Sequence, residues 1–185
     1  LDFKLVKAKK NQNIFFSKKK GWKINIFYTG NKSNTGGRLL KIKKIFKSNE
    51  LFFLTYGDGL ADININKLLN FHKRKNLIAT ITAVHPPARF GVLQIKNNKV
   101  RKFQEKIDNR DTWINGGFFV FNSKIFKYLD KATDSLEQNI LTKIVKAKSM
   151  SAYKHHNFWL PMDTLRDKNK LNELWKKNDA PWKLK

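Results

Sequence analysis

The feature that most constrains the fold is the stretch at residues 51–60, an apolar run that ends in Gly-Asp-Gly with the aspartate at position 58. The run is rich in aromatic and β-preferring residues, which predicts a strand covered on both faces. Apolar residues at helical spacing follow over residues 63–75, with Asp62 as the expected N-cap. Strand, glycine-bracketed aspartate and helix in this order are typical of a ligand site at the end of the strand, but taken alone the ten residues favour an ordinary Asp-Gly turn.

The rest of the chain alternates between expected strands and expected helices. Further strands are expected at residues 3–8, 22–28, 78–84, 92–95, 100–103, 113–121 and 150–155. Further helices are expected at residues 39–48, 123–129, 136–147 and 164–177, with polar surface loops at residues 9–21 and 29–38. Because Asn97-Asn98 also predicts a tight hairpin, we expect an α/β fold with a mixed sheet, as one domain over residues 1–185.

The composition excludes several classes of protein. Hydrophobic residues make up 41% and aromatic residues 13% of the chain, which argues against disorder. The chain has no cysteine, so disulfides and thiolate metal sites are excluded. No apolar run approaches the roughly 20 residues of a membrane span, and no signal peptide is evident. We therefore expect a cytoplasmic protein, cut at its N-terminus because the chain begins at Leu1.

The net charge of +25 admits a nucleic-acid or membrane partner, but the kind of basic residue argues against both. Of the 39 basic residues, 33 are lysines, and they are spread along the whole chain. Proteins that read phosphates and bases favour arginine, whose planar fork binds in a bidentate way. A bias toward Lys, Asn and Ile is also what a coding sequence of low GC content produces. A solvated basic surface is the favoured interpretation.

Two aspartates lie at expected element boundaries with glycine or proline close by. Asp58 follows the strand at residues 51–56, and Asp163 precedes the last expected helix. Mg²⁺ is usually held by one or two carboxylates together with substrate phosphates and water. Two aspartates from distant segments could therefore hold Mg²⁺ over a nucleotide. The alternative for Asp163 is a helix N-cap.

Three other segments carry groups suited to a sugar phosphate. Residues 29–38 combine hydroxyls, glycines and Arg38, as a phosphate-binding loop or an ordinary flexible loop would. Glu105-Lys106 offers an acceptor beside a cation, or else is a solvated pair. Asn115-Gly116-Gly117 lets a backbone approach a ligand, although a β-bulge explains these glycines equally well.

The remaining polar residues do not suggest hydrolytic or zinc chemistry. His155 and His156 are adjacent on an expected strand, so their side chains should point to opposite faces and not share a metal. The chain has no Ser-His-Asp or Glu-x-x-His pattern.

Five ordered motifs resemble those of the glucose-1-phosphate cytidylyltransferases, within the sugar nucleotidyltransferases. They are Thr35–Arg38, Thr55–Gly59, Phe103–Lys106, Trp113–Phe118 and Pro161–Lys168. The similarity runs from about Trp22 to the end, including Ala180–Lys183. The resemblance implies a Rossmann-like mixed sheet and the Mg²⁺-dependent joining of CTP and α-D-glucose 1-phosphate into CDP-glucose and pyrophosphate, for dideoxysugar and surface-polysaccharide synthesis (the O-antigen of lipopolysaccharide). It also implies a homo-oligomer.

The resemblance also implies roles for individual residues. Asp58 and Asp163 would be the magnesium ligands and, with Lys106, the catalytic residues. The substrate-contacting positions would be Ser33, Arg38, Gly57, Glu105, Lys106, Asn115 and Gly116. Among these, Glu105 would meet glucose hydroxyls and Lys106 the sugar phosphate. An oxygen of the sugar phosphate would attack the α-phosphorus of CTP in line, so no protein nucleophile is needed.

The chain departs from the family pattern at its start. The N-terminal strand and the glycine-rich loop that holds the nucleotide triphosphate are absent, and so is the lysine that follows this loop. We therefore expect an N-terminally truncated enzyme that binds CTP poorly by itself, with an unpaired sheet edge where the first strand would lie. The alternatives are a non-catalytic sugar-phosphate-binding remnant and a basic nucleic-acid-binding protein.

Overall fold

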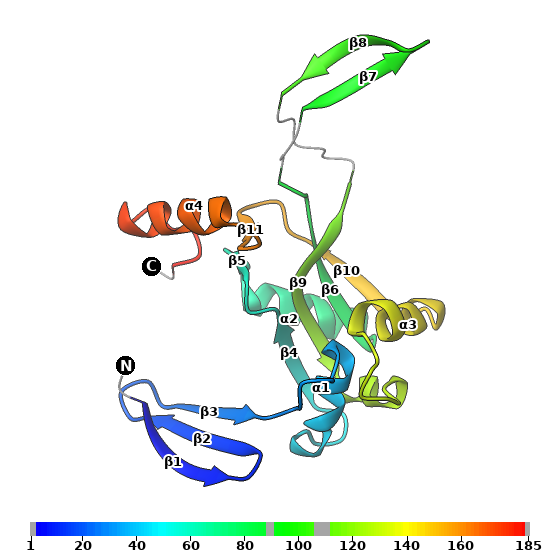
Figure 1. Cartoon of the computed structure of the whole chain (residues 1–185). Coiled ribbons are helices and arrows are strands. Elements are labelled where there is room, and N and C mark those ends of the chain that lie inside the picture. The colour runs from blue at the N-terminus through cyan, green and yellow to red at the C-terminus, as the bar shows by residue number, and fades with distance from the viewer. Residues whose placement is uncertain (1–2, 88–90, 106–111, 184–185) are drawn as a thin grey trace. The chain divides into compact units, whose positions relative to one another are not determined.

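The computed structural model describes residues 3–87, 91–105 and 112–183. Contacts within the chain divide it into two compact units, whose elements are labelled in Figure 1. The first unit comprises Leu1–Glu50 and Ser123–Lys148, and the second comprises Leu51–Asn122 and Ser149–Lys185. The single domain expected over the whole chain stays a prediction, and the two units are described separately.

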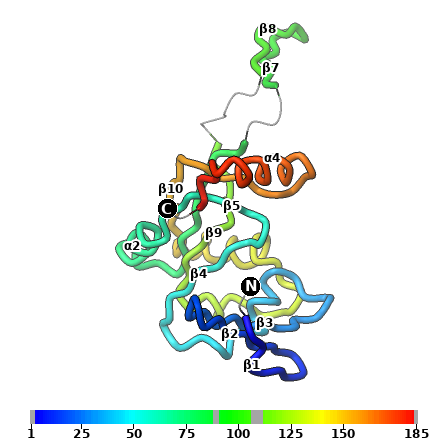
Figure 2. The backbone as a smooth tube through the Cα atoms, turned by 90° about the vertical axis from the view of Figure 1, so that its left-hand side faces the viewer, coloured from blue at the N-terminus to red at the C-terminus, as the bar shows by residue number. Residues whose placement is uncertain are grey.

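The first unit begins with an antiparallel meander of three strands, which follow one another at the blue end of the tube in Figure 2. They are β1 (Phe3–Lys9), β2 (Gln12–Ser17) and β3 (Trp22–Phe27). The expected loop at residues 9–21 is therefore wrong, because β2 occupies its middle. The β-preferring residues of β2 explain this: Phe15 pairs with Leu5 on one side and with Ile24 on the other.

The first unit also contains four helical segments. They are α1 (Thr35–Lys41), a 3₁₀ turn at Lys43–Ile45, a 3₁₀ segment at Ser123–Tyr128, and a π-helical turn at Leu136–Leu141 that continues into α3 (Thr142–Lys146). The helix expected at residues 39–48 thus begins earlier and ends earlier than expected. Residues 35–38 are helical rather than part of a surface loop.

Two glycines explain why α1 begins where sequence analysis expected a loop. Gly36 and Gly37 are buried against residues 132–134, and Gly37 N–H donates to the carbonyl oxygen of Asp134 at 3.1 Å. A Cβ atom on Gly37 would collide with the backbone of Ala132. These glycines therefore serve close packing of the helix against a neighbouring backbone, and not loop flexibility.

The second unit is built on a four-stranded mixed sheet in the order β10-β6-β9-β4. Its strands are β4 (Leu51–Thr55), β6 (Ala79–Val84), β9 (Ile114–Asn122) and β10 (Met150–Lys154). β6 and β10 are parallel, and β9 is antiparallel to both β6 and β4. α2 (Ile65–Lys75) packs against β6, β9 and β10, which confirms the expected α/β fold with a mixed sheet.

The position of β4 differs from the expectation. β4 lies at an edge of the sheet with β9 as its neighbour, and the expectation that both of its faces are covered is wrong, because none of its residues is fully buried. The side chain of Phe53 is accordingly 45% exposed. The core of the sheet lies instead over β6 and β9, where Phe119 and Phe121 are fully buried and stack with their ring centroids 5.2 Å apart.

The second unit also contains two short antiparallel pairs and a last helix. β5 (Gly59–Ala61) pairs with β11 (Trp159–Pro161), and β7 (Val92–Lys96) pairs with β8 (Lys99–Gln104). Asn97 and Asn98 have φ of 53° and 58°, which confirms the tight hairpin turn between β7 and β8. α4 covers Leu165–Lys176.

The N-cap of α2 is not the residue that was expected. Asn64 caps the helix, and its side-chain oxygen accepts from Lys67 N–H at 2.9 Å. Asp62 instead lies 2.9 Å from the imidazole of His155. Among the described residues, none of the helices is both long enough and apolar enough to span a membrane.

A buried histidine of α2 makes the stability depend on pH. The Nδ1 atom of His72 lies 2.8 Å from Thr80 Oγ1, and burial lowers the pKa of this imidazole. Because the pKa is lower in the folded state, the unfolded chain takes up the proton first as the pH falls below about 6.5. We expect the thermal midpoint to fall between about pH 7 and pH 5, and His72→Gln to lack this part of the loss. An identical pH profile for the variant, followed by circular dichroism, would contradict the assignment.

The buried glycines of α1 give a second prediction. Gly37→Ala should lower the free energy of unfolding by about 1–3 kcal/mol, because the added methyl group must displace the backbone of Ala132. Gly57→Ala is the matched control, since an added Cβ there has no atom within 4 Å among the described residues. Urea titration of both variants measures the difference, and equal effects would refute the packing role of Gly37.

Candidate active site

The antiparallel pair of β5 and β11 forms a two-stranded ribbon, called the β5–β11 ribbon below, and Asp58 and Asp163 lie at the same end of it. Pro161 pairs with Gly59, and the next backbone group along, Met162 N–H, donates to the carbonyl oxygen of Asp58 at 2.8 Å. Asp163 follows Met162 directly, so the backbones at positions 58 and 163 lie close together although they are far apart in the sequence. The role of these carboxylates as metal ligands stays a prediction.

Asp163 is not needed to cap the helix that follows it, which was the alternative interpretation. Thr164 is the N-cap of α4, because its side-chain oxygen accepts from Asp167 N–H at 3.2 Å. Asp167 completes a capping box by accepting from Thr164 N–H at 3.1 Å. The N-cap interpretation of Asp163 is therefore wrong.

The glycines beside Asp58 are not required by the backbone. Among the described glycines, only Gly21, Gly30 and Gly117 have positive φ, so the turn at Asp58 does not depend on a left-handed glycine. A Cβ on Gly57 would meet no atom within 4 Å, and one on Gly59 would make only ordinary contacts. The bend at residues 57–58 is therefore made without a left-handed glycine. Gly57 is exposed, and within the described parts of the chain nothing blocks the space where its Cβ would lie, so its backbone is accessible to a ligand.

The Asn115-Gly116-Gly117 segment forms a β-bulge in β9, where the register against β6 shifts. Gly117 has a φ of 76°, and a Cβ there would lie 2.5 Å from the ring of Tyr56. The Asn115 amide oxygen accepts from Gly117 N–H at 2.8 Å, and its amide nitrogen donates to the Tyr56 hydroxyl at 3.2 Å. The bulge interpretation of these glycines is confirmed. A substrate contact by Asn115 or Gly116 stays a prediction.

A hydrogen bond from Trp159 connects the β5–β11 ribbon to this bulge. Its indole N–H donates to the carbonyl oxygen of Gly116 at 2.7 Å, and Tyr56 N–H donates to the carbonyl oxygen of Gly117 at 3.3 Å. The ribbon and the end of β4 therefore both attach to the same bulge of β9. Nothing in the local sequence pattern marks Trp159 as a hydrogen-bond donor to a distant glycine.

Two further predicted site residues lie in the first unit. The Ser33 hydroxyl is buried and donates to the carbonyl oxygen of Thr29 at 2.6 Å, so it stabilises the turn before α1. Arg38 is exposed, and one of its guanidinium N–H groups donates to the Thr29 hydroxyl at 2.8 Å. Both residues thus make contacts within their own unit, and their substrate roles stay predictions.

The remaining predicted pair is Glu105-Lys106. Glu105 follows β8 and is exposed, and a Cβ added to Gly91 would lie 3.1 Å from its carboxylate oxygen. Lys106 lies outside the described residues. The pair therefore remains a predicted contact to the sugar and its phosphate.

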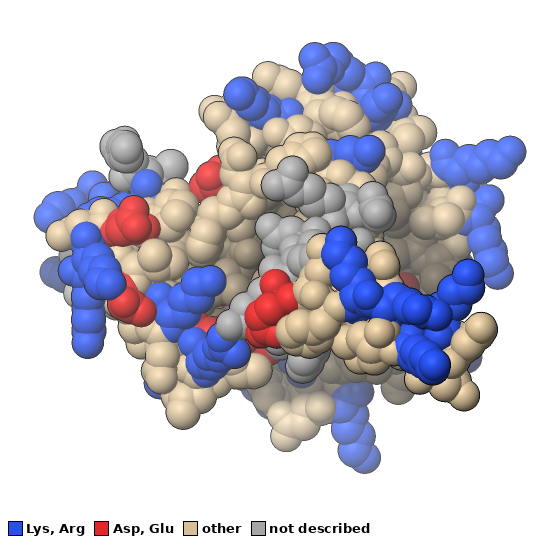
Figure 3. Space-filling model, turned by 90° about the horizontal axis from the view of Figure 1, so that it is seen from above, with Lys and Arg blue, Asp and Glu red and all other residues tan. Residues whose placement is uncertain are grey.

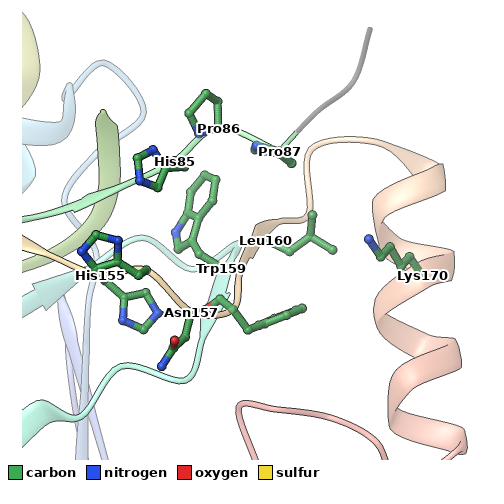
Figure 4. Close-up of a pocket in the computed structure, with 10 residues that line it drawn as sticks. His85, Pro86, Pro87, His155, Asn157, Trp159, Leu160 and Lys170 are labelled. Atoms are coloured by element: carbon green, nitrogen blue, oxygen red, sulfur yellow. Dashed lines mark hydrogen bonds between the residues drawn. The ribbon is translucent and has the colours of Figure 1, made fainter. Parts of the chain in front are cut away.

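A cavity of about 500 Å³ lies on the second unit beside β11 (Figure 4). It is lined by His85, Pro86, Pro87, residues 155–160 and Lys170, whose side chain extends from α4 toward Leu160 in Figure 4. His85 packs against Trp113 with ring centroids 3.9 Å apart. His155 is buried whereas His156 is exposed, so the two adjacent imidazoles lie in different environments. Sequence analysis did not identify this cavity.

The basic residues do not gather into a single band on the face seen in Figure 3. Lysine and arginine side chains form several separate groups there, with acidic side chains between some of them. On this face the positive charge does not form the continuous track that a nucleic-acid groove presents.

Comparison with known proteins identifies the family. The model of the nucleotidyl transferase family matches residues 5–179. Over 176 residues, the chain is 42% identical to the glucose-1-phosphate cytidylyltransferase of Salmonella typhimurium, covering 95% of this chain and 68% of that protein. It is 37% identical over 164 residues to the probable glucose-1-phosphate cytidylyltransferase of Bacillus subtilis, covering 88% of this chain and 64% of that protein. The chain thus spans about two thirds of the length of these relatives.

Solved structures agree on the fold. A putative glucose-1-phosphate thymidylyltransferase from Bacillus anthracis superimposes with a TM-score of 0.59 at 18% identity, covering 80% of this chain and 65% of that one. HddC from Yersinia pseudotuberculosis gives a TM-score of 0.59 at 18% identity, covering 81% and 65%. At this identity the likeness bears on the fold alone, and it matches the mixed sheet flanked by helices. The family match over residues 5–179 and the 42% identity to a relative show that the chain belongs to the nucleotidyl transferase family.

Proposed function

We propose that the chain is the metal- and sugar-phosphate-binding part of a glucose-1-phosphate cytidylyltransferase, which acts in the cytoplasm as a homo-oligomer. The reaction is transfer of the cytidylyl group from CTP to α-D-glucose 1-phosphate, giving CDP-glucose and pyrophosphate. The observation that carries the proposal is the β5–β11 ribbon, which brings positions 58 and 163 to one end of the same element. The choice of cytidine follows from the 42% identical relative of that name.

The residues at the end of the ribbon fit Mg²⁺. Asp58 and Asp163 supply carboxylate oxygens, the ligands that hard divalent cations prefer, and Mg²⁺ sites commonly add substrate phosphates and water to one or two carboxylates. Among the described residues there is no cluster of three or more His, Cys, Asp or Glu side chains arranged to hold a metal. A two-carboxylate site completed by phosphates is consistent with that finding. Bound Mg²⁺ would neutralise charge on the phosphates.

The chain's own residues bind and orient the substrates. The open space at Gly57 admits a phosphate or a sugar next to the backbone. Asn115 has a second amide N–H besides the one given to Tyr56, and Glu105 offers carboxylate oxygens to sugar hydroxyls. Lys106 supplies a cation for the sugar phosphate. In-line attack by a phosphate oxygen on the α-phosphorus then needs alignment and charge neutralisation, and no protein nucleophile.

Metal binding by this chain tests the proposal without requiring turnover. Asp58→Asn and Asp163→Asn should each weaken Mn²⁺ binding at least about tenfold, because each removes one of two anionic ligands. Electron paramagnetic resonance of free Mn²⁺ measures the affinity. Asp179→Asn is the control, since Asp179 is an exposed aspartate of the same unit and its replacement should leave the affinity unchanged. Equal affinities for all variants would refute the metal assignment.

Calorimetry with glucose 1-phosphate tests the substrate class separately. We expect saturable binding in the presence of Mg²⁺ that weakens several-fold in Glu105→Gln, because the variant loses a charged acceptor for sugar hydroxyls. Glu173→Gln removes an equal charge from α4 and serves as the control. Absence of heat with glucose 1-phosphate, in a protein that binds Mn²⁺, would contradict the assigned sugar while leaving the metal site intact.

A further inference from the structure

A partly buried acid–imidazole pair lies at the end of the β5–β11 ribbon opposite the two aspartates. Asp62 directly follows β5, and its Oδ1 atom lies 2.9 Å from Nε2 of His155. The side chain of His155 is 7% exposed and that of Asp62 is 27% exposed. Neither residue has a place in the proposed reaction.

The contacts of His155 show which of its ring nitrogens carries a hydrogen. Phe158 O can only accept, and it lies 3.1 Å from His155 Nε2, so this nitrogen carries a hydrogen and donates to the carbonyl. The buried Asp62 Oδ1 lies 2.9 Å from the same nitrogen, and among the described residues no donor makes a hydrogen bond to it. A buried carboxylate oxygen without a donor is costly by itself. Something other than the stability of this one contact therefore accounts for its presence.

The pair joins the ribbon to the main sheet. His155 N–H donates to the carbonyl oxygen of Ala83 on β6 at 2.9 Å, so the histidine is attached to a buried strand. Asp62 N–H donates to the carbonyl oxygen of Phe158 at 3.3 Å, next to the same imidazole. One histidine thus contacts both chains of the ribbon where β5 ends and β11 begins.

The ribbon needs such a constraint. Each of its strands has only three residues, and an isolated pair of this length specifies its register weakly. A slip by one residue would move Asp163 about 3.3 Å along the ribbon relative to Asp58. Metal–ligand distances tolerate only about 0.2 Å. Holding register is also the best-attested use of buried polar or ionic groups.

We propose that Asp62 and His155 are positioning residues that set the register of the β5–β11 ribbon and thereby place Asp58 and Asp163 opposite each other for one divalent cation. The part of this inference that concerns the cation rests on the proposed function. The part that concerns the register does not.

Two measurements on the complete chain test the inference. Hydrogen exchange at Met162 N–H, which donates to the carbonyl oxygen of Asp58 at 2.8 Å, reports the register without any ligand. Asn122 N–H, which donates to the carbonyl oxygen of Ile78 at 2.8 Å, is the reference amide in the main sheet. Mn²⁺ affinity reports the placement of the carboxylates.

Asp62→Asn keeps the shape of the side chain and removes its charge. We expect exchange at Met162 to speed up at least about tenfold while exchange at Asn122 is unchanged, and Mn²⁺ to bind about tenfold more weakly. His155→Gln keeps a donor for the Phe158 carbonyl, so it should speed up Met162 exchange and weaken Mn²⁺ binding by smaller factors. His155→Ala should change both quantities as much as Asp62→Asn does. The Asp62→Asn/His155→Ala double variant should lose no more Met162 protection and no more Mn²⁺ affinity than either single variant, because the two residues act as one unit.

The matched control is Glu173→Gln, which breaks the 2.6 Å ion pair with Lys177 on α4 in the same unit and removes an equal charge. It should change neither measurement. Unchanged Met162 exchange in Asp62→Asn and His155→Ala would overturn the inference. If the chain binds no Mn²⁺ at all, the metal assignment fails, and Met162 exchange alone decides the role of the pair. If Asn122 also exchanges faster in a variant, the main sheet itself is destabilised. Met162 exchange is then compared between the unmodified protein and His155→Gln.

Discussion

The antiparallel pairing of β9 with β6 on one side and β4 on the other is the interaction on which the second unit depends. β9 carries the fully buried Val120 and Phe121, and its bulge interrupts the register only at its N-terminal end. The interior of the strand therefore buries apolar surface, while the bulged end presents polar backbone. Two neighbouring residues bond to this end: Tyr56, through its backbone N–H and its hydroxyl, and Trp159, through its indole N–H.

This pairing provides a packed sheet that supports the exposed β5–β11 ribbon. The aspartates are not on the main sheet but on a short ribbon, which Trp159 attaches to the bulge at one point and His155 attaches to β6 at another. Two attachments on different strands restrain both the position and the register of the ribbon. A binding site on a short element supported from a packed sheet combines access for substrates with a defined geometry.

Sequence reasoning succeeded where a long, regular pattern decided the structure. The apolar runs of β4 and β6 and the helical spacing of α2 were assigned correctly, and so was the Asn97-Asn98 turn. It failed where a residue's partner lies far away in the sequence. Gly36 and Gly37 were read as parts of a loop because the backbone of residues 132–134, which requires them to be glycines, is almost a hundred positions distant. Asp62 was read as a cap because its histidine partner is equally remote.

The sequence alone determined the alternation of strands and helices, the presence of a mixed sheet and the order of the motifs that mark the family. These properties depend on local preference and on periodicity, which neighbouring residues report. Only the tertiary structure decided that positions 58 and 163 meet at one ribbon end, that Thr164 rather than Asp163 caps α4, and that β4 lies at an edge of the sheet. Each of these depends on which distant backbone groups satisfy each other's hydrogen bonds, and no local pattern encodes that choice.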